Sequence, residues 1–318
     1  MSPPALPEAI VITGPTGTGK SALGVEVAER LNGAIVSADS RQIYRHMDIG
    51  TAKPSAALRR RVPHYGLDLL DPDESYSAGR FARDAWRWIE EVAECGKVPV
   101  IVGGTGFFIR ALLEPLGPEP EPMPERLTPV RRYLSSLPVE ELHRWLRRLD
   151  PQRAEQLSGE GGRQRLGRSL EVVLLSGRRH SWWLRRPART APLAACVFCL
   201  VLRREEHNRR IDERFDRMVE EGLVDEVRGL LERFAADAPG LNSVGYAELI
   251  AHLGGAYSLE VAVEAAKRST RRYARRQSTW FRHQLPEDTV WLAADRSRAE
   301  LADEIARAWR DRTASLAG

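Results

Sequence analysis

The feature that most constrains this chain is a glycine-rich loop near its N-terminus. Residues 14–21 read GPTGTGKS and fit the P-loop pattern G-x4-G-K-[ST]. The apolar run 9–12 precedes the loop, and residues 21–31 carry apolar side chains at helical spacing. The backbone N–H groups of such a loop bind an anion at the N-terminus of the following helix. The loop therefore predicts a phosphate or diphosphate site, with ATP as the default ligand.

Every residue of this loop is a candidate for binding the phosphates. Lys20 would place a positive charge on the phosphate oxygens, and Ser21 would reach a Mg²⁺ ion that bridges them. Mg²⁺ is therefore the expected cofactor, with Ser21 as its expected ligand. The predicted diphosphate-binding residues are Gly14, Pro15, Thr16, Gly17, Thr18, Gly19, Lys20 and Ser21.

Strands and helices alternate along the first hundred residues. Apolar runs predict strands at 9–12, 34–38 and 98–102, and apolar periodicity predicts helices at 21–31 and 78–95. This alternation predicts a parallel, doubly wound α/β sheet, whose ligands lie beyond the carboxyl ends of the strands. Asp39 and Thr105 follow two of these strands. A P-loop NTPase would usually have an acid after a later strand, whereas 98–102 is followed by Gly-Gly-Thr.

The composition changes after Glu114, where prolines become frequent. Helical patterning resumes at 139–149 and 166–175, and an apolar run at 195–202 predicts a return to the sheet. Helix is expected for most of the chain beyond residue 202, with a long helix that begins after Ser258 and runs to about His283. We predict a core of residues 1–111 and 190–318, interrupted by a helical insertion at 112–189.

Positive charge is concentrated in two segments. The chain has 48 basic and 44 acidic residues, for a net charge of +4. Segment 163–189 contains eight arginines and one glutamate, and segment 267–282 contains Lys267 and six arginines without an acid. Such clustering predicts a polyanionic partner, although a solvated helix face is the alternative for the second segment. On that segment Arg268, Arg272, Arg275 and Arg282 share one arc of the predicted helix.

Several classes of protein are not indicated. The first residues lack a cationic segment followed by an apolar one, and the longest apolar run, 191–202, is shorter than the roughly 20 residues of a membrane span. Three cysteines are an odd, sparse set that favours a reducing compartment, so we expect a cytoplasmic location and no membrane partner. Cys196 and Cys199 form a CxxC inside a predicted strand and are expected to pack in the core.

Eight blocks of sequence resemble the bacterial tRNA dimethylallyltransferases, also called tRNA isopentenyltransferases. They occur in that family's order and spacing at 14–21, 38–54, 76–85, 98–113, 164–172, 210–227, 243–249 and 275–282. The resemblance implies transfer of a dimethylallyl group from dimethylallyl diphosphate to N6 of adenosine 37, beside the tRNA anticodon, with release of diphosphate. It also implies an α/β fold with a P-loop NTPase/kinase-like parallel sheet core and a helical insertion that binds tRNA.

The resemblance also assigns roles to single residues. Asp39 matches the base that accepts a proton from N6, Arg214 matches an arginine that holds the diphosphate, and Thr105 matches a residue that touches the tRNA. The residues alone leave Asp39 open as a metal second-sphere ligand or a helix cap, and Arg214 as a partner of a helix glutamate. The implied tRNA-binding residues are Asp39, Ser40, Arg41, Gln42, Thr105, Gln164, Arg165, Leu166, Gly167, Arg168, Ser243, Gly245 and Tyr246.

Two departures from the family pattern concern tRNA contact. Ala247 stands where the family usually has arginine or lysine, and Leu127 stands where an arginine is usual. The alternatives are an ATP-dependent small-molecule kinase, an enzyme that prenylates free adenine nucleotides, and a non-catalytic RNA-binding protein. The two basic segments favour tRNA, and intact Lys20 and Asp39 favour an enzyme. We expect a monomer that uses dimethylallyl diphosphate and the anticodon stem-loop.

Overall fold

A computed structural model describes residues 8–114, 117, 120, 124–158, 162–186 and 191–317. The chain divides into two compact units: residues 1–114 with 192–318, and residues 115–191. The sequence predicts the insertion at 112–189, and its role in binding tRNA stays a prediction. Each unit is described by itself.

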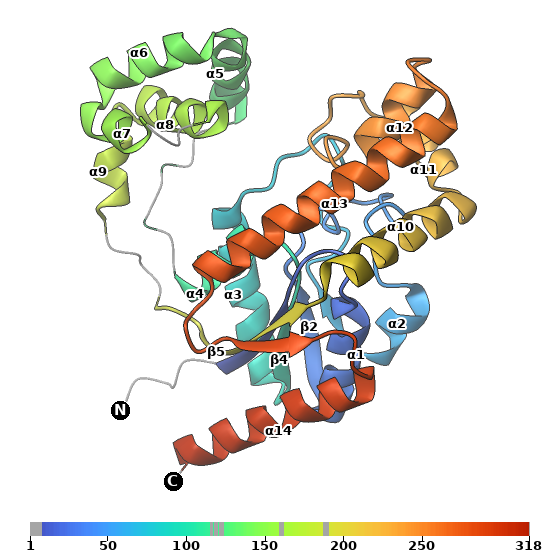
Figure 1. The fold of residues 1–318 in the computed structure, drawn as a ribbon. Helices are drawn as coiled ribbons and strands as arrows, with labels where there is room; N and C mark the ends of the chain where they lie inside the picture. The colour runs from blue at the N-terminus through green and yellow to red at the C-terminus, as the bar shows by residue number, and fades with distance from the viewer. Residues whose placement is uncertain are drawn as a thin grey trace. The chain divides into compact units, whose positions relative to one another are not determined.

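The first unit is built on a six-stranded sheet with the strand order β3-β2-β4-β1-β5-β6 (Figure 1). Every strand pair recorded among the described residues is parallel, which confirms the predicted α/β class. Two short strands were not predicted: one lies at each edge. The strands are β1 (Glu8–Thr13), β2 (Gly33–Ser37), β3 (His64–Tyr65), β4 (Val98–Val102), β5 (Ala194–Val201) and β6 (Val290–Ala293).

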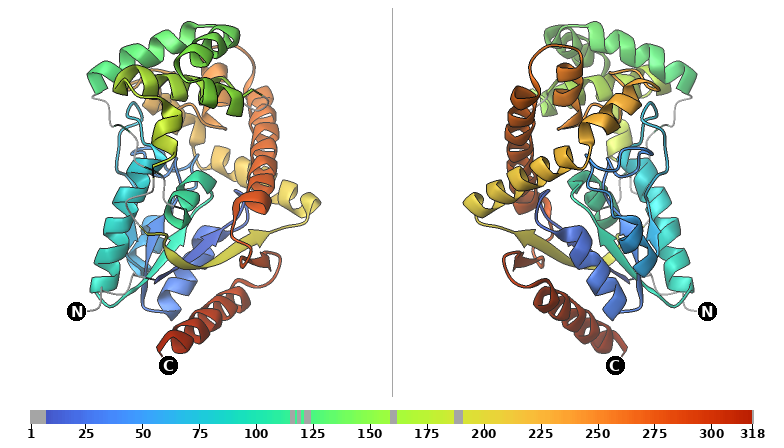
Figure 2. Two further views of the ribbon diagram at one scale, coloured as in Figure 1. Left: turned by 90° about the vertical axis from the view of Figure 1, so that its left-hand side faces the viewer. Right: turned by 90° about the vertical axis from the view of Figure 1, so that its right-hand side faces the viewer.

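Helices cover both faces of this sheet, because apolar side chains alternate along the buried strands. One face, which includes Ile10 and Phe198, packs with α1 (Lys20–Arg30) and α14 (Arg298–Ala317). The other face, which includes Val11 and Val197, packs with α3 (Ala78–Glu94) and α4 (Gly106–Leu113). In both views of Figure 2, α14 (dark red) lies beside α1 (blue). The sheet is therefore doubly wound.

The two cysteines of the CxxC lie on opposite faces of β5, because they are three residues apart on a strand. Cys196 packs against the α1 face and Cys199 belongs to the α3 face. Burial raises the pKa of the Cys199 thiol to about 12. The expected packing in the core is confirmed for Cys199, whereas Cys196 is half-buried at the edge of the core.

A helical layer of the first unit has its own apolar core, which includes Ile43, Phe215 and Tyr246. Within it, α10 and α13 lie side by side (Figure 1). Ser258 caps α13 as predicted, since its hydroxyl accepts from the N–H of Val261. This layer consists of α10 (Arg204–Glu220), α11 (Leu223–Leu231), α12 (Tyr246–Leu253) and α13 (Leu259–Gln284), with residues 43–52 and 69–70. The short helix α2 (Ala56–Arg61) packs instead on the α1 face of the sheet, through Leu58.

The second unit is a small bundle of helices around a core that includes Leu142, Leu146 and Leu170. Both helices predicted for this region are present. Buried Asp150 holds the bundle together, because its carboxylate accepts from the N–H groups of Arg153 and Ser181. The helices are α5 (Pro124–Ser136), α6 (Val139–Leu149), α7 (Pro151–Gln156), α8 (Arg163–Ser176) and α9 (His180–Leu184).

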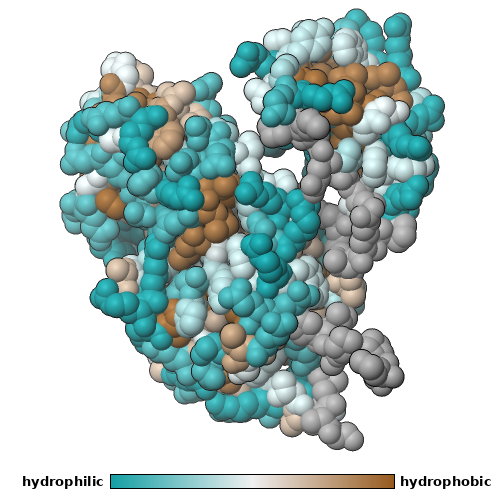
Figure 3. Space-filling view, turned by 180° about the vertical axis from the view of Figure 1, so that it is seen from behind, coloured by the Kyte–Doolittle hydropathy of each residue, from teal (hydrophilic) through white to brown (hydrophobic). Residues whose placement is uncertain are grey.

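Hydrophilic side chains cover most of the face shown in Figure 3, with smaller hydrophobic areas between them. Within the described part of the chain, every helix is too short or too polar to cross a membrane.

Candidate active site

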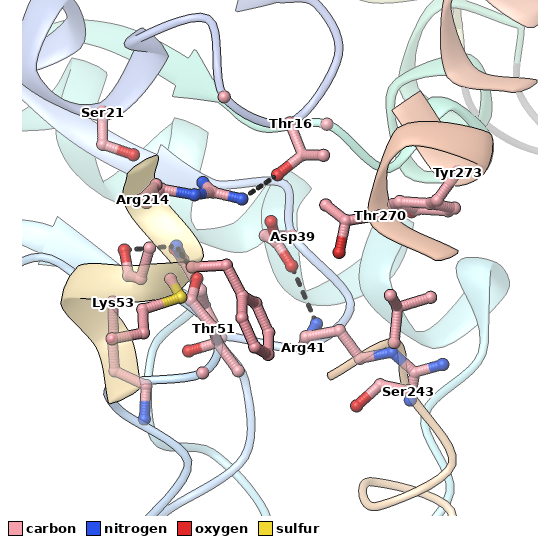
Figure 4. Close-up of a pocket in the computed structure, with 18 of the residues that line it drawn as sticks. Thr16, Ser21, Asp39, Arg41, Thr51, Lys53, Arg214, Ser243, Thr270 and Tyr273 are labelled. Atoms are coloured by element: carbon pink, nitrogen blue, oxygen red, sulfur yellow. Dashed lines mark hydrogen bonds between the residues drawn. The ribbon is translucent and has the colours of Figure 1, made fainter. Parts of the chain in front are cut away.

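A cavity of about 1060 Å³ opens in the first unit beyond the carboxyl ends of β1, β2 and β4. Its lining comes from the glycine-rich loop, the turn at 39–42, the segment 50–55, α10, the residues 242–248 and α13. Figure 4 shows Asp39 between Thr16 and Arg214 on one side and the helix that carries Thr270 and Tyr273 on the other. The sequence-based expectation that the loop and Asp39 meet is confirmed.

The glycine-rich loop curls tightly because its first glycine has no side chain. Gly14 has a φ of +139°, and a Cβ there would lie 2.6 Å from the backbone oxygen of Leu200. The hydroxyl of Thr18 donates to the carbonyl of Pro15 at 2.9 Å, and Thr18 is 3% exposed. The Thr18 side chain therefore stabilises the loop, and Thr18 is not among the residues that line the cavity.

Lys20 points into this loop and carries an easily lost proton. Its Nζ donates to the carbonyl of Pro15 at 2.7 Å. Desolvation lowers the pKa of Lys20 to about 8; the nearby Asp39 opposes the shift and Arg214 adds to it. An anion beside Lys20 would favour its charged form, so the lysine is suited to respond to a phosphate.

Arg214 projects from α10 toward the same loop. Its Nη2 donates to the hydroxyl of Thr16 at 2.8 Å (Figure 4). Desolvation lowers the pKa of Arg214, and the charge of Asp39 opposes this shift. The guanidinium thus bonds to the glycine-rich loop instead of to a glutamate of its own helix. Lys20 and Arg214 place two desolvated cations at one end of the cavity.

Asp39 follows β2 and is held by the turn that it begins. Its Oδ1 accepts from the N–H of Arg41 at 2.9 Å. The hydroxyl of Thr105 accepts from the N–H of Ser40 at 2.9 Å, and lies 3.2 Å from the Ser40 hydroxyl. Thr105 is not among the residues that line the cavity. It contacts the Asp39 turn from the start of α4, so the structure gives it a role in orienting that turn.

Two side chains predicted to contact tRNA hold loops of the protein in this structure. Arg41 donates to the carbonyls of Pro239 and Asn242 at 3.0 and 3.1 Å. Gln42 donates from Nε2 to the carbonyls of Thr51 and Ala52, both at 3.2 Å. Both residues line the cavity, as do Ser40 and Ser243. They fix the shape of its rim.

Tyr246 corrects the sequence-based assignment, because it lies in the core. It is 1% exposed, and its hydroxyl donates to Glu226 at 2.6 Å. The same carboxylate accepts from the N–H groups of residues 48, 49 and 50. The Tyr246 side chain therefore has no surface for RNA and supports the segment beside the cavity. Gly245, just before it, has a φ of +94° and packs against Phe215.

The predicted tRNA-binding block 164–168 lies on α8 of the second unit. Gln164 and Arg165 are exposed, whereas Leu166 is fully buried in that unit's core, so its side chain cannot contact RNA. Arg168 donates to Glu171 at 3.2 Å. Leu127, one of the two departures from the family pattern, lies on α5.

Sequence reasoning missed several residues that line the cavity, among them Lys53, Tyr273, Arg276 and Gln277. The signal was available, because these residues lie within or next to the blocks at 38–54 and 275–282. Of the four arginines predicted to share an arc on the late helix, Arg272 is the one that lines the cavity.

The cavity offers oxygen donors for a Mg²⁺ ion. The hydroxyl of Ser21 and the carboxylate of Asp39 both face it. The described residues contain no group of three or more histidine, cysteine or acidic side chains that could form a protein cage for a metal. Mg²⁺ usually keeps several waters and is held by one or two protein oxygens plus substrate phosphates. The donors present fit that mode of binding.

The fold and the cavity together define an α/β protein of the P-loop type, with a cavity beside its glycine-rich loop. Comparisons with known proteins narrow this class. The IPP transferase family model matches residues 42–284, and the isopentenyl transferase model matches residues 7–62. The chain belongs to the IPP transferase family, whose relatives carry the name tRNA dimethylallyltransferase. The resemblance seen in the eight blocks, and with it the expectation of a transferase, is confirmed.

Two of the relatives match over nearly their whole length, and a third matches over about three quarters of its length. The tRNA dimethylallyltransferase of Pelotomaculum thermopropionicum is 42% identical, over 94% of this chain and 95% of that protein. A solved tRNA isopentenylpyrophosphate transferase from Bacillus halodurans has a TM-score of 0.71 at 34% identity, over 98% of this chain and 99% of that chain. A eukaryotic dimethylallyltransferase solved while acting on tRNA has a TM-score of 0.77 at 27% identity, over 90% of this chain and 74% of that chain.

Proposed function

We propose that this chain transfers the dimethylallyl group of dimethylallyl diphosphate to N6 of adenosine 37, beside the anticodon of tRNA. The observation that carries the proposal is that a P-loop, Arg214 and Asp39 face a single cavity. A cradle for a diphosphate and a carboxylate for a proton are the two parts that such a transfer needs. The names and structures of the relatives support the same reaction.

The diphosphate end of the cavity promotes departure of the leaving group. As the allylic C–O bond breaks, negative charge develops on the diphosphate oxygens, and donors fixed in advance stabilise that charge most. Lys20, Arg214 and the loop residues Gly17, Gly19 and Ser21 line that end. Mg²⁺ held by the hydroxyl of Ser21 would neutralise further charge on the phosphates.

Asp39 acts on the acceptor base, adenine, as the group that takes a proton from N6. The lone pair of adenine N6 is delocalised into the ring, so a positioned base helps as the C–N bond forms and N6 loses its proton. A carboxylate placed beside N6 can accept this proton. The N–H of Arg41 binds one oxygen of Asp39, and Thr105 fixes the neighbouring Ser40. Asp39 is thereby oriented before substrate arrives.

The acceptor must enter the cavity as an unstacked base. Extrusion costs about a few kcal/mol, and least for a base already in a loop. Arg272 and Arg276 on α13 line the cavity and supply positive charge for the RNA backbone. Arg165 and Gln164 of the second unit are exposed and belong to the block that implies tRNA contact. With tRNA as its partner, the chain would act as a monomer in the cytoplasm.

The test is an anticodon stem-loop incubated with the protein, Mg²⁺ and dimethylallyl diphosphate, followed by mass spectrometry of its nucleosides. We expect one dimethylallyl group on adenosine 37 and none on a matched stem-loop with purine riboside there, which lacks the N6 amino group. Free AMP in place of the stem-loop tests prenylation of nucleotides. If no base is prenylated while ATP donates a phosphate to a small molecule, the proposal is wrong and a kinase is the better description.

A further inference from the structure

Thr16, in the glycine-rich loop, has all three of its polar groups bound by side chains from two distant helices. Its N–H donates to Oε1 of Gln277 at 2.9 Å, and its carbonyl lies 2.7 Å from Nε2 of His207. Its hydroxyl accepts from Arg214 at 2.8 Å. Gln277 belongs to α13, and the other two belong to α10. Neither Gln277 nor His207 was singled out by the sequence.

Gln277 joins two loops that follow different strands. While its Oε1 accepts from Thr16, its Nε2 donates to the carbonyl of Gly104 at 2.7 Å, and the residue is 8% exposed. A Cβ at Gly104 would lie 3.0 Å from Nε2, so the glycine makes room for the amide. Gly104 immediately precedes Thr105, which holds the turn of Asp39 through Ser40. The diphosphate cradle and the base are thus connected through one buried amide.

His207 supports the loop from the other side. A carbonyl oxygen only accepts hydrogen bonds, so Nε2 of His207 carries a proton and donates to Thr16. The imidazole is 8% exposed and lies against Gly17, where a Cβ would come within 3.6 Å of Nε2. Desolvation lowers the pKa of His207; the hydrogen bond to Thr16 opposes the shift, and Lys20, Arg214 and Arg210 add to it. The ring is therefore a neutral donor at neutral pH.

We propose that Gln277 and His207 are positioning residues that set the conformation of the glycine-rich loop for diphosphate, and that Gln277 also fixes this loop relative to the Asp39 turn. The proposal rests on the proposed function. Both side chains act through Thr16, whose N–H and carbonyl they occupy. If the bound conformation of a loop is only partly populated, the apparent affinity for its ligand falls by that fraction.

The first test measures binding of inorganic diphosphate with Mg²⁺ by calorimetry. In Gln277→Met and His207→Leu, which remove the partners of Thr16 at similar size, we expect Kd to rise about tenfold to hundredfold, as for loss of a buried hydrogen bond. His207→Gln keeps an N–H donor at a similar reach and should stay within about threefold of the original Kd. Ser278→Ala, next to Gln277 on α13, is the matched control and should change nothing.

The second test does not depend on a substrate. In the unaltered protein the amide of Thr16 should be protected from hydrogen exchange, and Gln277→Met should abolish that protection. NMR of the His207 ring should show the proton on Nε2. An unprotected Thr16 amide, a proton on Nδ1, or an unchanged diphosphate Kd in both Gln277→Met and His207→Leu would overturn the proposal.

These outcomes are separable from failure of the proposed function. If the unaltered protein binds diphosphate but prenylates no RNA, the function fails while the inference is still tested by Kd and exchange. If Gln277→Met or His207→Leu prevents folding, three measurements on folded protein still test the proposal. These are the diphosphate Kd of His207→Gln, exchange of the Thr16 amide, and NMR of the His207 ring. In turnover assays the KM for dimethylallyl diphosphate should rise in His207→Leu and recover in His207→Gln, while the stem-loop Kd stays unchanged.

Discussion

Positively charged side chains have different surroundings in the two units. On α13 of the first unit, Lys267 pairs with Asp216 at 2.6 Å and Arg271 pairs with Asp212. These cations bind α13 to α10, so they are engaged inside the protein. In the second unit acids are scarce on α8 and α9, and Glu171 forms ion pairs with Arg131 and Arg168. Segments 163–189 and 267–282 therefore carry similar net charge in the sequence, but the acids that neutralise it differ between the two units.

Arginines of the second unit also contact an aromatic ring at its surface. The guanidinium groups of Arg178 and Arg186 lie 4.6 and 4.0 Å from the ring centroid of Trp182, and both arginines are exposed. A cation over a ring keeps its charge, whereas a cation paired with a carboxylate is neutralised. Clustering in sequence therefore shows where charge lies, but acids on neighbouring elements decide how much of it can meet a polyanion.

The largest expected effect is a loss of turnover that leaves RNA binding intact. Asp39→Ala should lower turnover about 10²- to 10⁴-fold, the range for loss of a general base. Binding of the stem-loop and of diphosphate should be retained, since the cations of both units are untouched. Single-turnover prenylation and stem-loop titration measure the two effects. Near-normal turnover in this variant would remove Asp39 from the role of base.

The next effect is a pH dependence at Lys20. Its pKa is lowered to about 8, and a lysine loses its charge as pH rises through its pKa. Diphosphate should bind more weakly above pH 8, by up to about tenfold per pH unit, because binding then requires uptake of a proton. Calorimetry with dimethylallyl diphosphate from pH 7.5 to 9.5 measures this. Lys20→Arg is the control, since arginine does not titrate there; an equally flat profile in both proteins would contradict the prediction.

The two groups of cations on α13 should respond differently to substitution. Removing Arg272 and Arg276, which line the cavity, should weaken stem-loop binding and reduce the slope of log K against log salt by about 0.7–0.9 for each lost phosphate contact. Lys267→Met should leave that slope unchanged and lower the melting temperature, because it leaves Asp216 unpaired. A reduced salt slope in Lys267→Met would show that Lys267 also contacts RNA phosphates, as expected only for Arg272 and Arg276.

The elements of this fold with long apolar patterns were predictable. Four strands follow from apolar runs, and the helices α1, α3, α6 and α8 follow from apolar periodicity. The start of α13 follows from the cap residue Ser258. The edge strands were missed because β3 has two residues and β6 has four, which is too short for an alternating pattern. The relation between the glycine-rich loop and Asp39 was predictable from topology alone, since both follow parallel strands.

The contacts inside the site were not predictable from local pattern. Thr16 is bound by side chains 191, 198 and 261 positions further along the chain. Similarity of a block to a family also does not separate a residue that touches RNA from one that supports a loop. Leu166 and Tyr246 lie in such blocks, and the structure buries both side chains.

A smaller effect is expected for the exposed arginine of the second unit. Arg165→Ala should weaken stem-loop binding about two- to tenfold and reduce its salt slope by about one phosphate contact. The KM for dimethylallyl diphosphate should not change, because every described residue that lines the cavity belongs to the first unit. Turnover at saturating stem-loop is the control. A rise in that KM would show that the two units do not divide their roles in this way.

The smallest effect on RNA is expected at Tyr246. Tyr246→Phe removes the hydroxyl that Glu226 binds at 2.6 Å and keeps the ring in its buried place. The free energy of unfolding should fall by about 1.5–3 kcal/mol, the range for a hydrogen bond to a charged group. Stem-loop affinity and its salt slope should stay within twofold of the original, a change of about 0.4 kcal/mol or less. Denaturant unfolding and salt-dependent titration measure both quantities. If affinity falls strongly while stability is unchanged, the Tyr246 hydroxyl contacts RNA, and the cores of both units would need to be reconsidered as RNA-binding surfaces.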